Sequence, residues 1–334
     1  MAPSTSTIET VQLPQPIREK VITKATRVRQ PLNLSGALDA YQSFDVTPVI
    51  GREFPEVQLT SLLSAKNSHE LLRDLAITIS QRGVVFFRNQ DITIQEQKAL
   101  GSKLGELAGK PPTSKLHIHP VYNAARDAGI NDNEISTISS EQNKKLYTAT
   151  DFGGASGKRQ SDASSWHSDI TFEPIPSDYA ILKIIELPAT GGDTLWASGY
   201  EVFDRISKPY QTFLEGLTAT HSQPDFNAAA SRGGFTLFTQ ARGAPENVGE
   251  DLTAVHPVIR TNPVTGWKSV FAVGHHVKHI NGLSKRESDH LLKEFLKLVT
   301  TNHDLQVRFK WQKNDVAIWD NVRLPALSET VDSD

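Results

Sequence analysis

Two residues with metal-binding side chains, His167 and Asp169, stand two positions apart in the sequence Trp-His-Ser-Asp-Ile-Thr-Phe. The residues that follow, Ile170, Thr171 and Phe172, favour strands. Side chains at i and i+2 of a strand lie on the same face, so the imidazole and the carboxylate are expected to point to one spot. Together they would be two members of the two-His-one-carboxylate set of a non-heme Fe(II) site. A chance His-x-Asp at a solvated strand end is the alternative that this spacing leaves open.

The composition limits what other chemistry the chain can do. Its 334 residues include 35 lysines and arginines against 38 aspartates and glutamates, a formal charge of −3, which gives no basic surplus for nucleic acid or an anionic membrane. Cysteine is absent, which excludes disulfides, cysteine-ligated zinc, iron–sulfur clusters and thiol nucleophiles. No apolar run approaches the length of a membrane span. We therefore expect a cytoplasmic protein whose metal, if any, is held by His, Asp or Glu.

The first 35 residues differ in composition from the rest of the chain. They are rich in Pro, Ser and Thr and then in basic residues, so we expect a flexible or strap-like extension followed by one domain over residues 36–334. A cleaved transit peptide is the alternative, but Glu9 and Glu19 interrupt the acid-poor composition that it requires.

Hydrophobic periodicity predicts the elements that must position His167 and Asp169. Helices are expected at residues 61–82, 95–107 and 284–299. Short strands are expected at residues 84–87, 179–187, 194–198, 255–260, 269–273, 306–311 and 316–319. Residues 127–162 have weak periodicity and are a candidate loop or lid. Helices first and scattered strands later, without regular βαβ alternation, favour a mainly β barrel or sandwich with helical additions (α+β).

Further blocks extend this pattern over most of the chain. His167 and Asp169 are followed by Gly-Gly-Asp-Thr at residues 191–194, and preceded by His-Pro-Val-Tyr at residues 119–122. Other blocks are His-Pro-Val-Ile-Arg-Thr-Asn-Pro-Val-Thr-Gly at 256–266, Gln-Val-Arg-Phe-Lys-Trp-Gln at 306–312 and Asn-Asp-Val-Ala-Ile-Trp-Asp-Asn at 314–321. In this order the blocks resemble the taurine/sulfonate dioxygenase family of 2-oxoglutarate- and Fe(II)-dependent oxygenases. The resemblance runs from about residue 49 to residue 321.

The resemblance implies a double-stranded β-helix, or jelly roll, with iron at one mouth of the barrel. By match to the family, His167 and Asp169 would bind Fe(II), and the hydroxyl of Thr194 would help to hold the co-substrate 2-oxoglutarate. The expected partners are O₂ and a small organic substrate, with no nucleic acid or membrane, and a homo-oligomer stays open. The reaction would release succinate and CO₂ and, from a sulfonate, sulfite.

The resemblance also supplies substrate-contacting candidates. They are His119, Tyr122, Ile170 and His276. His119 and Tyr122 match the family's His-Pro-Val-Tyr, which suggests a small anionic, sulfonate-like substrate, although a boundary aromatic is the alternative for Tyr122. His276 stands at the family's pocket phenylalanine, and Ala163 replaces an asparagine of the taurine enzymes. A substrate other than taurine is therefore expected.

The chain departs from the family after Asn321. Ala326 stands where the third iron ligand, a histidine, is expected, and Asp334 is reached before the expected 2-oxoglutarate-binding arginine. We therefore expect the closing C-terminal strand to be missing, with an unpaired edge near the site. One hypothesis is an oxygenase of this family with a truncated C-terminus, for which Val322-Arg323 would be the translation of a retained intron.

Two alternatives to that hypothesis stay open. The chain could be a catalytically impaired or inactive relative that keeps the barrel and binds a small anion. A nearby histidine, such as His275 or His279, could instead supply the third ligand.

Overall fold

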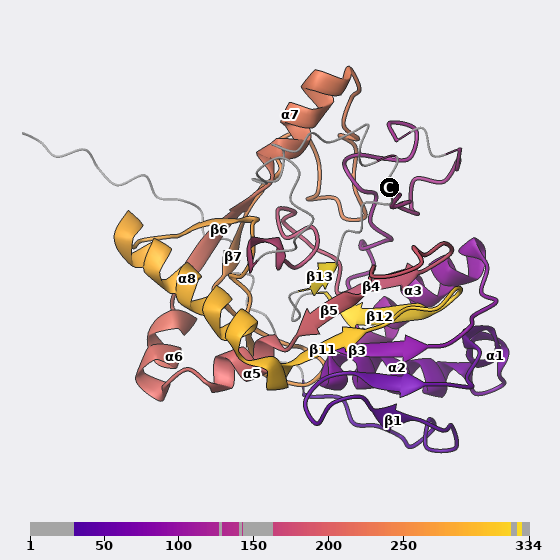
Figure 1. Cartoon of the computed structure of the whole chain (residues 1–334). Coiled ribbons are helices and arrows are strands. Elements are labelled where there is room, and N and C mark those ends of the chain that lie inside the picture. Colours follow the sequence, from indigo (N-terminus) through magenta and orange to yellow (C-terminus); the bar gives the residue numbers. More distant parts are fainter. Residues whose placement is uncertain (1–29, 127–128, 140–141, 143–162, 322–325, 329–334) are drawn as a thin grey trace, which may run out of the picture.

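The largest sheet of the protein has five strands in the order β1-β2-β3-β12-β4 (Figure 1). The structure is a computed structural model that describes residues 30–126, 129–139, 142, 163–321 and 326–328. The strands of this sheet are β1 (Phe44–Asp45), β2 (Arg52–Phe54), β3 (Val84–Phe87), β4 (Tyr179–Lys183) and β12 (Val316–Asp320). β2 and β3 are parallel, whereas the other neighbouring pairs are antiparallel.

The two central strands of this sheet, β3 and β12, are buried at every position. Val85 and Phe87 pack with the helices on one face, while Val84 and Phe86 pack with Trp196 on the other face. The Phe86 ring lies 5.4 Å from the Trp196 ring. Because side chains alternate across a strand, the continuous apolar sequence of β3 fits a strand covered on both sides.

The opposing layer is a three-stranded sheet in the order β11-β5-β13. Its strands are β5 (Thr194–Ala197), β11 (Gln306–Phe309) and β13 (Ala326–Ser328). β13 pairs antiparallel with β5, with Leu327 opposite Leu195. The prediction of a missing closing strand with an unpaired edge is therefore wrong, because the backbone after Asn321 returns to β5 although its sequence has left the family pattern.

Two smaller sheets complete the described strands. One contains β10 (Val277–Ile280), β6 (Thr218–Ser222) and β7 (Thr253–Pro257) in that order, and the other pairs β8 (Ile259–Thr261) with β9 (Lys268–Val270). The strand expected over residues 255–260 thus spans parts of two strands, β7 and β8. The sequence did not predict β6 or β10.

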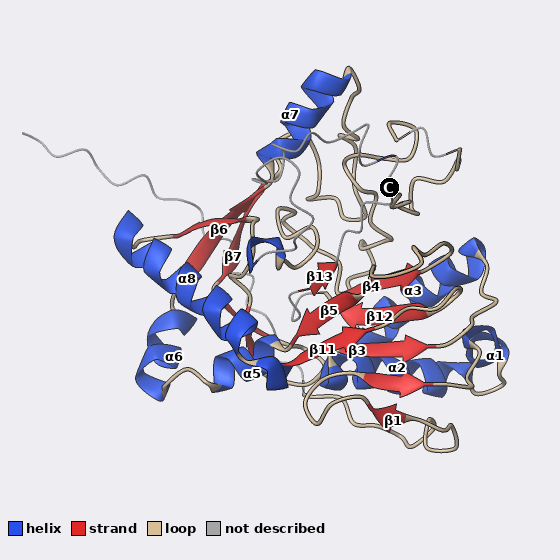
Figure 2. Cartoon of the chain, viewed as in Figure 1, coloured by secondary structure: helices blue, strands red, loops and turns tan. Residues whose placement is uncertain are grey.

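Helices flank the sheets on two sides (Figure 2). Three helices pack against one face of the large sheet: α1 (Leu59–Ser64), α2 (Ser68–Arg82) and α3 (Ile94–Ala108). The remaining helices are α5 (Gly199–Asp204), α6 (Lys208–Glu215), α7 (Pro224–Gly233) and α8 (Lys285–Thr301), with short 3₁₀ turns at Ala163–Ser165 and His303–Leu305. The single helix expected over residues 61–82 is two helices, because Ala65 is extended with ψ 148°. Strands and helices together make this a mixed α/β fold.

Residues 30–37, at the expected boundary of the N-terminal extension, are bonded to the domain. The buried carboxylate of Asp74 on α2 accepts hydrogen bonds from the backbone N–H groups of Ser35, Gly36 and Ala37 at 2.9 to 3.1 Å. Leu32 N–H donates to Val264 O at 2.8 Å. Residues 30–37 are thus held against the domain by hydrogen bonds, and residues 1–29 lie outside the described residues.

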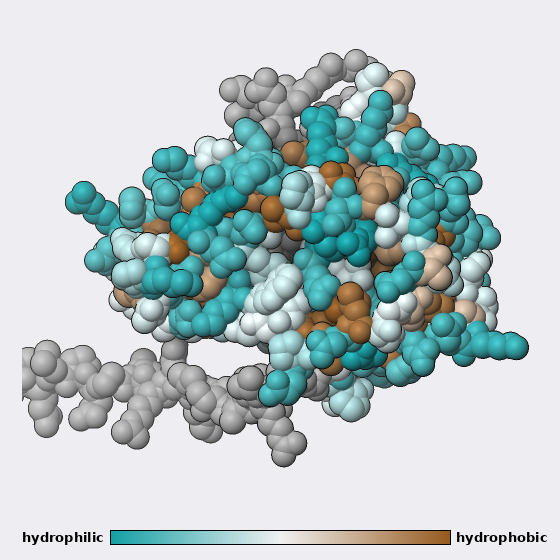
Figure 3. Space-filling model, turned by 90° about the horizontal axis from the view of Figure 1, so that it is seen from below, coloured by the Kyte–Doolittle hydropathy of each residue, from teal (hydrophilic) through white to brown (hydrophobic). Residues whose placement is uncertain are grey.

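The surface and the described part of the candidate lid give little information on where the site lies. None of the helices that the structure describes is long and apolar enough to cross a membrane. The face in Figure 3 is mostly hydrophilic, with hydrophobic residues in small separate groups. Most of the candidate lid at residues 127–162 lies outside the described residues.

Candidate active site

His167 and Asp169 converge, as the sequence predicted. His167 Nε2 lies 3.3 Å from Asp169 Oδ1. The expected regular strand is wrong, because His167 makes a single antiparallel bridge with Gly274 and Asp169 begins a turn. Ile170 in that turn has φ 51°, a left-handed conformation that is unusual for a β-branched residue. Strain of this kind collects at functional sites, where surrounding contacts must maintain it.

The contact that maintains the turn comes from Asn321, the residue after β12. Asp169 N–H donates to Asn321 Oδ1 at 2.9 Å, and Asn321 Nδ2 donates back to Asp169 O at 3.0 Å. Asn321 Nδ2 also donates to Ser177 O at 3.1 Å. Asn321 is 1% exposed, so these bonds compete little with water. In the sequence, Asn321 is only the last residue of a family block, and nothing there predicts this role.

A glycine permits the close approach on the other side of His167. Gly274 has φ +95°, and a Cβ built on it would lie 2.7 Å from His167 Cα and closer still to the Trp166 carbonyl oxygen. A real Cβ would force the two segments apart. The absence of a side chain at position 274 therefore lets the segment that carries His275 and His276 lie against His167.

The electrostatics of the pair favour a proton or a metal between the two side chains. His167 Nδ1 donates to Ser165 O at 2.8 Å, which leaves Nε2 facing Asp169. Burial disfavours the charged imidazole, but the hydrogen bond and charge of Asp169 outweigh it and raise the pKa of His167. A metal at Nε2 would displace this proton.

The pair fits two ligand positions of a metal ion. Metal–nitrogen and metal–oxygen bonds of about 2.0–2.2 Å set adjacent ligand atoms roughly 3 Å apart, close to the 3.3 Å observed. Within the described residues, no third His, Asp or Glu completes a metal-binding group with them. Ala326 has no donor atom in its side chain. The ring of His275 lies 4.8 Å from that of His167, whereas His279 is exposed on β10; neither forms a group of three with His167 and Asp169 among the described residues.

Thr194 occupies the first position of β5. It is buried, and its Oγ1 accepts a hydrogen bond from Trp311 Nε1 at 2.9 Å. Its own hydroxyl proton remains available to an acceptor such as a carboxylate. Gly191 and Gly192 before it both have φ 77°, in the left-handed region that glycine adopts readily. Among the described residues, no hydrogen bond joins Thr194 to His167 or Asp169.

His119 is connected to His167 through a row of aromatic rings. The ring centroids are 5.0 Å apart for His119 and Phe226, 5.7 Å for Phe226 and Phe172, 5.2 Å for Phe172 and His276, and 6.1 Å for His276 and His167. We call these five side chains the ring row. Tyr122 contacts Phe238 instead, at 5.8 Å. The structure thus brings His119 and His276 into one row with His167, whereas the Tyr122 ring packs against Phe238, which is not part of the row.

His119 is a neutral hydrogen-bond donor. Its Nδ1 accepts hydrogen bonds from Val121 N–H at 3.1 Å and from Arg126 Nη2 at 3.0 Å, so its proton lies on Nε2. Burial and the charge of Arg126 hold the pKa of His119 well below its usual value.

A buried ion pair that the sequence did not predict joins Glu173, the residue after the turn, to Arg242. Arg242 donates to both carboxylate oxygens of Glu173, with Nη2 to Oε2 at 2.9 Å, and His117 Nε2 donates to Oε1 at 3.1 Å. Burial disfavours the Glu173 carboxylate, but these two donors outweigh it and lower its pKa. His256 Nε2 donates to the backbone oxygens of Thr171 and Glu173. Nothing in the sequence spacing links Glu173 to Arg242.

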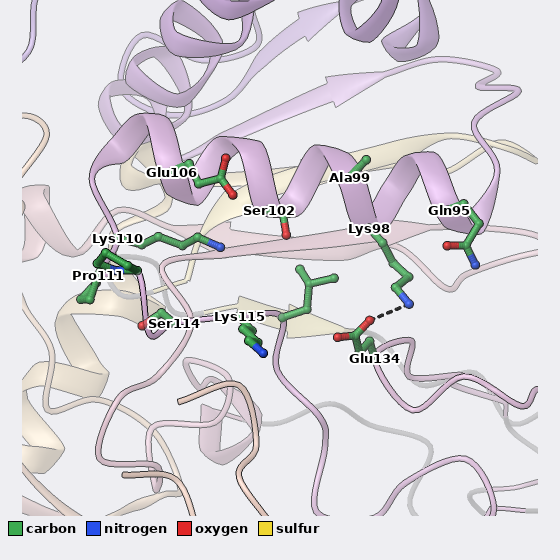
Figure 4. Close-up of a pocket in the computed structure, with 12 residues that line it drawn as sticks. Gln95, Lys98, Ala99, Ser102, Glu106, Lys110, Pro111, Ser114, Lys115 and Glu134 are labelled. Carbon is green, nitrogen blue, oxygen red and sulfur yellow. Dashed lines mark ion pairs between the residues drawn. The ribbon is translucent and has the colours of Figure 1, made fainter. Parts of the chain in front are cut away.

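A hollow in the described part of the chain lies away from these residues. It has a volume of about 710 Å³ and lies along α3, where Lys98 pairs with Glu134 at 2.5 Å (Figure 4). Lys110 and Lys115 also line it. None of the predicted site residues does, so this hollow is not the candidate active site.

Comparison with known proteins agrees with the resemblance. Residues 42–324 match the family model described as "Taurine catabolism dioxygenase TauD, TfdA family". The alpha-ketoglutarate-dependent dioxygenase btcD of Neocamarosporium betae is 56% identical over 306 residues, which cover 88% of this chain and 87% of that protein. An alpha-ketoglutarate-dependent sulfonate dioxygenase of Saccharomyces cerevisiae is 33% identical over 280 residues, 84% of this chain and 60% of that one.

The fold agrees as well. The crystal structure of a taurine dioxygenase from Burkholderia xenovorans superposes with a TM-score of 0.60 at 23% identity, over 86% of this chain and 82% of that chain. This family implies a jelly roll, which is also the barrel architecture expected from the sequence resemblance. The chain belongs to the TauD/TfdA family of alpha-ketoglutarate-dependent dioxygenases, whose cofactors are Fe(II) and 2-oxoglutarate.

Proposed function

We propose that the chain hydroxylates a small organic substrate at a site where His167 and Asp169 hold Fe(II). The convergence of His167 Nε2 and Asp169 Oδ1 at 3.3 Å carries this proposal. When bound, Fe(II) and 2-oxoglutarate would supply the oxidising power, with O₂ consumed and succinate and CO₂ released. Thr194 is proposed to donate its hydroxyl proton to a carboxylate of 2-oxoglutarate.

The chain's own residues would orient the ligands and exclude water. Ser165 fixes the His167 tautomer, and Asn321 fixes the Asp169 backbone. Such supporting bonds typically change metal affinity or activity by about 10–100-fold when removed. The ring row would form an apolar wall beside the reacting carbon, with His119, Tyr122, Ile170 and His276 proposed to contact the substrate.

A small sulfonate is the more specific candidate substrate, with sulfite as a further product. It is supported by the named activity of the Saccharomyces cerevisiae relative and by the match of His119 and Tyr122 to the family's substrate block. The more similar btcD is named only as a dioxygenase.

A second candidate function is an impaired relative that binds a small anion without turnover. Ala326, in place of the third ligand, favours it. Two protein ligands are expected to hold Fe(II) more weakly than three, so the intact chain is expected to form little succinate.

Anaerobic calorimetric titration of the full chain with Fe(II) tests the proposed ligands. His167→Ala and Asp169→Ala are each expected to weaken binding at least tenfold, because each removes one of two protein ligands. His279→Ala, at an exposed position on β10, is the matched control and should change nothing. Equal Fe(II) affinity in all four proteins would contradict the ligand assignment.

Ala326→His separates the two candidate functions. In an oxygenase that lacks only its third ligand, the added imidazole should raise both Fe(II) affinity and succinate formation from 2-oxoglutarate. If Fe(II) binds but no succinate forms even in Ala326→His, the impaired relative is the better description.

A further inference from the structure

The side chain of Gln223 is buried without any hydrogen-bond partner in the described part of the chain. It is 1% exposed, and neither Oε1 nor Nε2 is bonded. Buried amides in folded proteins are almost always hydrogen-bonded, since leaving water without a new partner is unfavourable. An amide left with both atoms unpaired is therefore a candidate ligand-binding group.

Gln223 lies beside the ring row. It follows β6 and directly precedes α7, and Ser222 N–H donates to His276 O at 2.8 Å. Three residues further on, Phe226 contacts both Phe172 and His119. The segment carrying Gln223 thus connects two members of the row. His276 Nδ1 is likewise buried and without a partner among the described residues.

Two buried arginines near the row, Arg126 and Arg242, are already engaged. Arg126 donates to His119 Nδ1, Val121 O and Thr137 O. Arg242 donates to both oxygens of the Glu173 carboxylate. A sulfonate would have to break one of these sets of bonds to gain either of these two cations. Without such a break, Gln223 offers an uncharged amide and His276 an imidazole nitrogen.

The geometry points to a subsite, formed by Gln223 and His276, for an uncharged polar group of the substrate that both donates and accepts hydrogen bonds. A carboxamide is the simplest such group. Gln223 Nε2–H can donate to its carbonyl oxygen, and its N–H can donate to Gln223 Oε1. A sulfonate offers acceptors only and would leave Oε1 unpaired. Because Gln223 and His276 are both buried, entry of a ligand requires side-chain rotamer changes, which are common on binding.

This inference rests on the proposed function only for the oxidation and puts a carboxamide in place of the sulfonate as the candidate substrate group, so its test measures binding alone. Calorimetry on the full chain, without metal or 2-oxoglutarate, would compare pentanamide with pentane-1-sulfonate. Pentanamide is expected to bind at least tenfold tighter. Gln223→Met, which keeps the length of the side chain and removes both polar atoms, should weaken pentanamide at least tenfold and leave pentane-1-sulfonate unchanged.

Two controls separate recognition from a structural role. Gln95→Met changes a glutamine of the α3 hollow and should alter neither affinity. The Tm of Gln223→Met should equal or exceed that of the wild type, because the substitution removes two unpaired buried atoms, whereas a structural glutamine would lower it.

The inference is overturned if neither probe binds, if the sulfonate binds as tightly as the amide, or if Gln223→Met leaves pentanamide affinity unchanged. Failure of Fe(II) binding with the pentanamide result intact would instead refute the proposed function alone.

Discussion

Gly274→Ala offers the sharpest test of how the His167 site is built. The new Cβ would lie 2.7 Å from His167 Cα, far inside van der Waals contact, and φ +95° is unfavourable for any residue with a Cβ. The backbone conformation costs about 1–2 kcal/mol for an L-residue, and overpacking adds about 1–3 kcal/mol. The expected loss in the free energy of unfolding is therefore about 2–5 kcal/mol, a large part of the roughly 5–15 kcal/mol of a typical domain.

Gly282→Ala is the matched control because it isolates the backbone contribution. Gly282 has φ +79°, and a Cβ there would meet nothing within 4 Å. It should cost only the backbone component, about 1–2 kcal/mol. The difference between the two variants in urea unfolding then reports the clash at His167.

Fe(II) titration of the same two variants gives a second readout. Gly274→Ala should weaken Fe(II) binding, because the clash displaces His167, whereas Gly282→Ala should not. If both variants lose the same stability and bind Fe(II) equally, the close approach at Gly274 does not position His167 and the reasoning fails.

Three further predictions concern the supports of the turn. Glu173→Gln should lower the free energy of unfolding by about 3–5 kcal/mol, since it leaves the buried Arg242 charge uncompensated. As a control, Asp304→Asn at the exposed Arg205–Asp304 pair should lower it by less than about 1 kcal/mol. Similar losses in the two variants would contradict the role of the Glu173–Arg242 pair. Asn321→Ala should lower both Tm and Fe(II) affinity, because it removes both hydrogen bonds to the Asp169 backbone. Unchanged Fe(II) binding would show that the turn keeps its conformation without Asn321. Burial and the charge of His256 lower the pKa of His221 to about 3, so below about pH 6.5 the unfolded chain takes up a proton that the folded chain does not. This group should thus lower the free energy of unfolding by about 1.4 kcal/mol for each unit that the pH is lowered. His221→Gln should remove this contribution from the difference in stability between pH 6 and pH 5, measured by urea unfolding.

Local signals made some elements predictable. The starts of α3 and α8 are set by capping boxes, Thr93 with Glu96 and Ser284 with Glu287, whose bonds lie within four residues of sequence. β3 and β12 were likewise found, because strands buried on both faces read as apolar runs. β6, with the sequence Thr-Ala-Thr-His-Ser, carries no such run and depends on partners distant in sequence.

The convergence of His167 and Asp169 was predictable from the sequence, but the backbone conformation that produces it was not. His167 and Asp169 do converge, yet the strand-forming residues after them lie in a turn, because tertiary contacts override local propensity there. The buried, unpartnered state of Gln223 could not be predicted either. Whether an amide finds a partner depends on what the fold places around it, not on its neighbours in sequence.

The fixed position of β12 explains how the turn can hold the left-handed conformation of Ile170. β12 is buried throughout and pairs with β3 on one side and β4 on the other, so it is a rigid reference for whatever follows it. Asp320 is fixed further by a 2.7 Å hydrogen bond from Asn262. Asn321 therefore presents its amide at a set position, and its two bonds to the Asp169 backbone resemble a strand pairing made by a side chain. The turn can hold a left-handed Ile170 because the central sheet, not the turn's own sequence, determines where Asp169 lies.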